Sequence, residues 1–128
     1  MTDELSPSIS AFEALVGEAF EALSEEFGEA LDNVAVVVED WPDRETLRLA
    51  GVRSPAQLLG FYHGTPQAQR GHNYSLVPPD KISIYRGPIA RLCRNHEALR
   101  ALVERVLRHE IAHHFGIDDD RLHEIGAY

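Results

Sequence analysis

Apolar positions recur at helical spacing near the start of the chain. Between Ser8 and Phe27 they form one stripe on a 3.6-residue period, which predicts an amphipathic helix with that stripe in the core. The stripe consists of Phe12, Leu15, Val16, Ala19, Phe20, Leu23 and Phe27. Residues 28–33 are expected to connect this helix to the next element.

Three later segments have the composition of strands. Val34–Glu39 is mostly apolar and β-branched, which is typical of a central strand. Leu58–His63 is predicted to be the second strand. In Lys81–Arg86 two isoleucines alternate with polar side chains, which indicates a half-buried strand that ends at Gly87 and Pro88.

Helices and a loop are expected between and after these strands. Arg44–Leu49 is predicted as a short helix that ends near a glycine, and residues 65–79, rich in Gly, Pro, Gln and Asn, as a long loop. A pair of helices is expected from about Ile89, with Asn95 as the N-cap of a long helix that extends to Phe115. The pattern predicts an α+β fold in which a small mixed sheet packs against the N-terminal helix and the long helix.

The long helix places polar groups on its apolar side. At about 100° per residue its leucines and valines fall on one arc, and His109, Glu110 and His113 fall on or beside that arc. Buried imidazoles and carboxylates are costly unless they pair or bind a metal. The alternative is a helix with two satisfied core histidines and a partly solvated glutamate.

Residues 109–119 follow the pattern HExxHxxGxxD. Four residues advance a helix by roughly 400°, so the two histidines of the pattern share one face with the glutamate beside them. This set can hold one zinc ion and activate one water. Gly116 suits a left-handed turn at the helix end, which brings Asp119 back as the third ligand. Asp118 and Asp120 remain alternatives, and one of them could cap a helix near Arg121.

These residues resemble a family of small bacterial zincin-like metallopeptidases of the Asp-zincin type, in which two histidines and an aspartate hold zinc. The resemblance extends over roughly residues 34–128. It is carried by His109–Ile117 with Asp119, by Arg121–Gly126, by Lys81–Ile89 and by Gly60–Pro66. The resemblance implies a minimal zincin-like fold, one Zn²⁺ per chain and peptidase activity.

The chain departs from larger zincins. Asp119 stands where metzincins have a third histidine, and because the only methionine is Met1, a methionine turn beneath the metal is not expected. The chain ends at Tyr128, so no C-terminal subdomain is expected as the far wall of a cleft. His123 and Glu124 are reserve candidates for the metal shell.

The resemblance also suggests where a substrate would lie. In zincins the strand before the metal-binding helix commonly forms the sheet edge where an extended peptide can pair, and here that strand would be Lys81–Arg86. The alternative is an ordinary edge strand whose charges block aggregation. His114 is expected to pack or to support a ligand rather than to bind metal. Side chains that could line a cleft, or simply lie on the surface, are His63, His72, Tyr74 and Arg86.

Composition narrows the class of protein. A chain of 128 residues fits one domain, residues 1–128, with one core. The net charge of −9 argues against nucleic-acid binding. The N-terminus lacks the basic start and apolar core of a signal peptide, no apolar run reaches membrane-spanning length, and Cys93 is the only cysteine. These features favour the cytoplasm and a buried, unpaired thiol.

The sequence therefore predicts a zinc metallopeptidase that acts on a peptide or protein substrate. Glu110 would be the general base for a water activated by zinc on His109, His113 and Asp119. One alternative is a noncatalytic metal- or peptide-binding domain with the same fold. Another is a metal-dependent hydrolase of a non-peptide substrate such as RNA, which the acidic charge disfavours. The ligand set would also suit Fe, Co or Mn.

Overall fold

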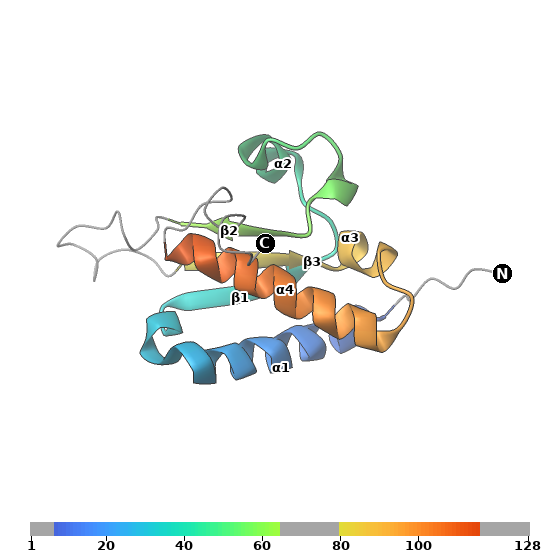
Figure 1. Cartoon of the computed structure of the whole chain (residues 1–128). Coiled ribbons are helices and arrows are strands. Elements are labelled where there is room, and N and C mark those ends of the chain that lie inside the picture. Colours follow the sequence, from blue (N-terminus) through green and yellow to red (C-terminus); the bar gives the residue numbers. More distant parts are fainter. Residues whose placement is uncertain (1–6, 65–79, 116–128) are drawn as a thin grey trace, which may run out of the picture.

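The computed structural model describes residues 7–64 and 80–115, in which helices and strands follow the predicted order (Figure 1). The elements are α1 (Ile9–Phe27), β1 (Val34–Glu39), α2 (Arg44–Ala50), β2 (Gly60–His63), β3 (Asp80–Tyr85), α3 (Arg86–Arg91) and α4 (His96–His114). Two short 3₁₀ helices, Gly28–Leu31 and Pro55–Gln57, lie after α1 and before β2. The predicted α+β class is confirmed. No helix in these two described stretches has the length and apolarity to cross a bilayer.

The three strands form one mixed sheet in the order β1-β3-β2. β3 is parallel to β1 and antiparallel to β2. The prediction that Lys81–Arg86 forms the sheet edge is therefore wrong, as is the prediction that Val34–Glu39 is central. Nor is β3 half-buried, because Ser83 and Tyr85 on its polar side are 0% and 1% exposed.

The polar side of β3 is buried because its neighbours satisfy it. The Ser83 hydroxyl donates to Glu39 Oε2 at 3.1 Å and lies 3.1 Å from His63 Nε2. These partners come from β1 and β2, the strands on either side. A hydrogen-bonded hydroxyl loses little by burial, so polar alternation along a strand does not require solvent on that face.

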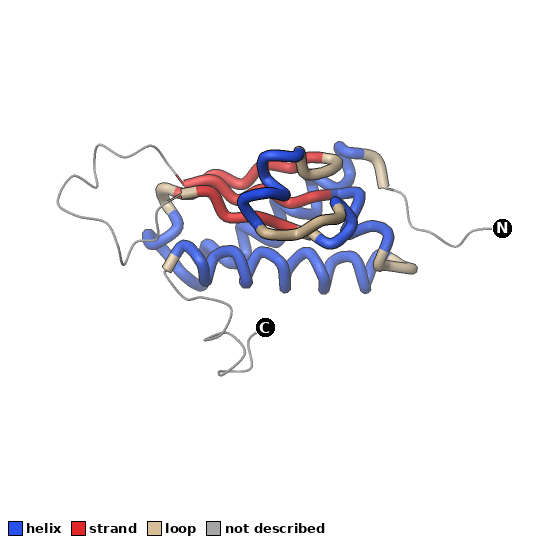
Figure 2. Tube along the Cα trace, turned by 90° about the horizontal axis from the view of Figure 1, so that it is seen from above, coloured by secondary structure: helices blue, strands red, loops and turns tan. Residues whose placement is uncertain are grey.

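The opposite face of the sheet is covered by α1 and α4, which lie side by side (Figure 1). Arg100 pairs with Glu18 and Arg108 with Glu26, so the two helices run in the same direction. These exposed ion pairs contribute little stability. The strands form one layer with α4 alongside it in Figure 2. The buried core comprises Phe12, Val16, Leu23, Leu31, Ile82, Ile84, Ile89, Cys93, Leu99, Val103, Val106, Leu107 and Ile111.

Side-chain caps fix the starts of α1, α2 and α4. Ser8, Asp43 and Asn95 each accept a hydrogen bond from the backbone N–H three residues later, which satisfies an otherwise unpaired donor. The predicted cap of α4 by Asn95 is thus confirmed. α3 begins at Arg86, before the predicted Ile89, because a proline is tolerated in the first turn of a helix.

The lone cysteine belongs to the core. Cys93 is 3% exposed and packs in the apolar cluster. Burial raises the pKa of its thiol, because the interior disfavours the thiolate. Cys93 therefore serves as a small apolar side chain rather than as a nucleophile.

Candidate metal centre

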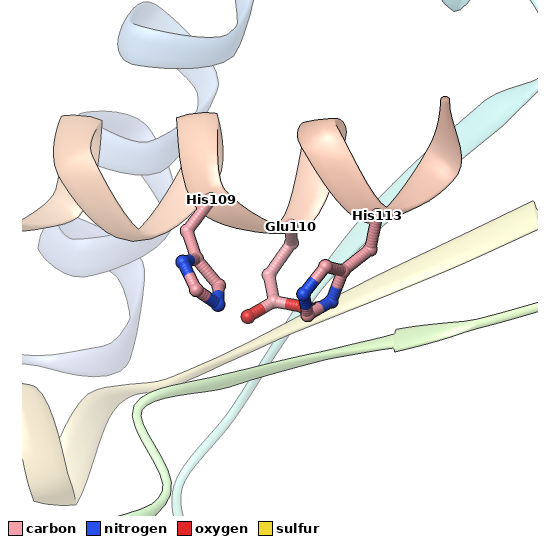
Figure 3. A group of neighbouring side chains, drawn as sticks. All are labelled: His109, Glu110 and His113. Carbon is pink, nitrogen blue, oxygen red and sulfur yellow. Dashed lines mark ion pairs between the residues drawn. The ribbon is translucent and has the colours of Figure 1, made fainter. Parts of the chain in front are cut away.

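The last two turns of α4 bring together His109, Glu110 and His113. Each residue offers one ligand atom, and these atoms lie within 4.8 Å of one another. The two imidazole rings are 4.7 Å apart between centroids and tilted by 64°. Figure 3 shows all three side chains pointing from α4 towards the sheet. The geometry expected from the four-residue spacing is therefore present.

Burial differs sharply within the cluster. The Glu110 side chain is 7% exposed and that of His113 is 27% exposed. Glu110 Oε1 lies 3.3 Å from His113 Nδ1, the contact marked by the dashed line in Figure 3. Burial raises the free energy of an unpaired carboxylate, so the imidazole beside Glu110 offsets part of that cost. The predicted inward phase of Glu110 is confirmed, and the two histidines lie at the margin of the buried face.

A glycine in β2 allows α4 to approach the sheet at this point. A side-chain carbon at Gly60 would lie 2.7 Å from Val106 Cγ1 and 3.4 Å from Glu110 Cγ. It would also lie 3.1 Å from the Ser83 carbonyl oxygen. The absent side chain at Gly60 therefore makes the room in which Glu110 packs beside the sheet.

A cavity of about 450 Å³ opens beside the cluster. One wall is α4, with Leu102, Arg105 and Val106 next to the three polar residues. The facing wall is the segment 57–62, which leads into and includes most of β2. Leu49, Ala50 and Val52, at the end of α2 and just after it, complete the lining. The segment between β1 and β2 thus supplies a wall that the sequence had not indicated.

The remaining candidates divide into two groups. His63 and Arg86 do not line this cavity: His63 contacts Ser83, and Arg86 pairs with Asp40. Burial, followed by the charge of Lys81, lowers the pKa of His63. The candidates outside the described residues are His72, Tyr74, Gly116, Asp118, Asp119, Asp120, His123 and Glu124.

His114 points away from the cavity and is 1% exposed, as expected for a residue that packs rather than binds metal. Its ring contacts Asp80, a buried carboxylate at the start of β3 that the sequence analysis did not single out. The available signal was the strand period, because Asp80 shares its phase with Ile82 and Ile84 of the core face.

Comparison with known proteins settles the family. A profile described as zincin-like metallopeptidase matches residues 31–127. The chain belongs to this family. A solved structure, a conserved hypothetical protein from Thermo thermophilus, is similar at 29% identity with a TM-score of 0.51. The similarity covers 85% of this chain and 94% of that one. No curated protein matches the chain.

The residues of this zincin-like chain fit a zinc ion. The imidazoles of His109 and His113 are donors that zinc takes in open sites, where a carboxylate is a common further donor. Donors that share a zinc at about 2.1 Å are about 3.4 Å apart, so small side-chain rotations would bring atoms within 4.8 Å into range. The family implies zinc binding, and this cluster is a group of described residues that could hold the ion.

Replacing Gly60 by alanine should disturb the fold and the site together. The added carbon would collide with Val106, so we expect a loss of about 1–3 kcal/mol in the free energy of unfolding. Gly17→Ala is the matched control, since nothing lies within 4 Å of that position in α1 and alanine should stabilise the helix by about 0.5–1 kcal/mol. Urea denaturation of both variants measures this. Equal stability of Gly60→Ala and the wild type would contradict the close approach.

Proposed function

We propose that this protein is a zinc-dependent peptidase in which Glu110 is the general base and His109, His113 and Asp119 are the ligands. The observation that carries the proposal is a buried glutamate between two half-buried imidazoles on the wall of an open cavity. The match to the zincin-like metallopeptidase family supports metal-assisted peptide hydrolysis as the chemistry of this arrangement. Asp119 enters through the HExxHxxGxxD spacing alone, since it lies outside the described residues.

Glu110 has the surroundings of a proton carrier. Its carboxylate is shielded by β2 and faces the cavity beside His113. A general base must reach the proton it takes, and a water in this cavity would lie within hydrogen-bond range of the carboxylate. We infer that Glu110 takes a proton from the attacking water and returns it to the leaving amine. Zinc, when bound, supplies a Lewis acid that makes such a water acidic near neutral pH.

The strand beside the cluster favours an extended peptide as substrate. Among the described strands β2 is at an edge of the sheet, and residues 60–62 line the cavity opposite α4. An edge strand offers backbone N–H and C=O groups with which an extended peptide can form a further strand. We therefore assign to β2 the substrate-pairing role first expected of Lys81–Arg86. The net charge of −9 supports a peptide or protein rather than a nucleic acid as the partner.

Metal content tests the site directly. Protein purified without a metal-affinity tag should carry about one zinc per chain by mass spectrometry, as expected of an open three-ligand site. His109→Ala should lose the zinc, because two protein ligands hold the ion too weakly. His63→Ala is the control, since that histidine contacts Ser83 outside the cavity. A wild-type protein that stays free of metal after zinc is added back would contradict the proposal.

Glu110→Gln tests the chemistry apart from metal binding. The amide keeps the shape of the side chain but cannot accept a proton, so hydrolysis should fall by about 10²–10⁴-fold while zinc remains bound. Cleavage of a fluorogenic peptide library, screened first with the wild type, measures the effect. Glu104→Gln, an exposed carboxylate on the same helix, should cleave as the wild type does. Undiminished cleavage by Glu110→Gln would rule out its role as the base.

The identity of the third ligand can be decided by comparing three neighbouring aspartates. Asp119→Asn should weaken zinc binding by at least about tenfold, since it removes a charged donor from a three-ligand site. Asp118→Asn and Asp120→Asn should bind zinc nearly as tightly as the wild type. Competition with a chromogenic chelator measures all three affinities. If another of these variants loses the affinity instead, the ligand is that residue.

A further inference from the structure

A second polar cluster lies on the buried side of α4, below its last turn. It consists of Asp80 from β3, Tyr62 from β2 and His114. The side chains of Asp80 and His114 are each 1% exposed, and His114 Nδ1 lies 2.6 Å from Asp80 Oδ2. The Tyr62 hydroxyl donates to the same oxygen at 2.5 Å. The proposed hydrolysis gives none of these three side chains a chemical role, although Tyr62 also lines the cavity.

The ring of His114 is held at both of its nitrogens. Besides the contact of Nδ1 with Asp80, Nε2 lies 3.3 Å from the Ala30 carbonyl oxygen. One neighbour is a carboxylate oxygen and the other a backbone carbonyl oxygen, so two polar contacts on opposite sides of the ring fix its orientation. The ring cannot rotate without losing both contacts, and neither nitrogen is left for a metal.

Asp80 is itself fixed by the sheet. It occupies the first position of β3 and faces the core together with the two isoleucines of that strand. The chain also passes close to its second oxygen, because a side-chain carbon at Gly64 would lie 2.5 Å from Asp80 Oδ1. The carboxylate is therefore a rigid anchor point for whatever it contacts on α4.

The contacts of Asp80 link the two walls of the cavity, α4 and β2. His114 follows His113 directly in α4, and Tyr62 belongs to the edge strand that lines the facing wall. We propose that Asp80 is a positioning residue for the metal centre. Through His114 it fixes the last turn of α4, and with it the imidazole of His113, at a set distance from β2. This inference rests on the proposed function.

If Asp80 only stabilised the fold, its replacement would have a different effect from the one that a positioning role predicts. If the buried pair only stabilised the fold, Asp80→Asn would lower the unfolding temperature and leave the metal affinity of the folded protein unchanged. A positioning role requires the affinity of the folded protein to fall as well, because groups that orient metal ligands tune affinity without touching the ion.

The experiment uses the full chain with zinc and cobalt as probes. We compare the wild type with Asp80→Asn, His114→Asn and Val16→Ala, below the unfolding temperature of each apo-protein. Val16 is buried in α1, and the pairing of Glu18 with Arg100 places it beside the first half of α4, away from the cluster. Chelator competition gives the zinc affinity, visible absorption of the Co²⁺ form reports ligand geometry, and circular dichroism gives apo-protein stability.

Asp80→Asn should bind zinc about 10–100-fold more weakly and change the Co²⁺ spectrum. His114→Asn, whose amide can donate to Asp80 as Nδ1 does, should keep more of the affinity than Asp80→Asn. Val16→Ala should lower stability only. Wild-type affinity and spectrum in Asp80→Asn would overturn the positioning role.

If Asp80→Asn does not fold, Tyr62→Phe decides the question, because it removes a single hydroxyl from a partly exposed ring. Unchanged zinc affinity in Tyr62→Phe would then overturn the inference, and a reduced affinity would support it. A wild type that binds no zinc would overturn the proposed function and this inference together. Equal affinity in the wild type and Asp80→Asn would overturn the inference alone.

Discussion

The site depends on how closely α4 packs against the sheet. At Gly60 the helix approaches β2 until only the absence of a side chain keeps Val106 clear of the strand. This contact buries Glu110, whereas the neighbouring histidines remain half-buried. A helix held further from β2 would leave Glu110 open to solvent on the side that the strand now covers. The tight packing at Gly60 and the burial of Glu110 are therefore the same feature.

The adjacent residues His113 and His114 face different surroundings because of helix geometry. A step of one residue turns a helix by about 100°, so His113 lies by the cavity while His114 faces the core. Each imidazole has a carboxylate beside it, Glu110 in one case and Asp80 in the other. This pairing lowers the cost of placing four ionisable groups in and around the last turns of α4. The pairs differ in access to solvent, which favours metal chemistry at the first and anchoring at the second.

What the sequence predicts correctly is mostly local. The helical period located α1 and α4, and Asn95 marked the start of α4, because caps and apolar stripes act over a few residues. The strand order was predicted wrongly because pairing is non-local: the polar face of β3 finds its partners in Glu39 and His63, which lie far away in the chain. For the same reason the cavity wall contributed by residues 49–59 could not be foreseen from the metal-binding motif. Asp80 was missed because the predicted strand began one residue later.

The buried pair of Asp80 and His114 is difficult to explain by stability alone. Burying a carboxyl group and an imidazole is costly even when they contact each other, and apolar side chains of similar size commonly stabilise a core as well or better. What apolar packing does not supply is direction, since it fixes neither the rotation of a ring nor the register of a helix end to a fraction of an ångström. The polar contacts at both nitrogens of His114 do so. In the proposed site the residue that benefits is His113, whose imidazole would have to meet the other ligands at a single point. A metal site at the end of α4, as proposed, would need that end held in place, and this pair lies in the core rather than in the cavity.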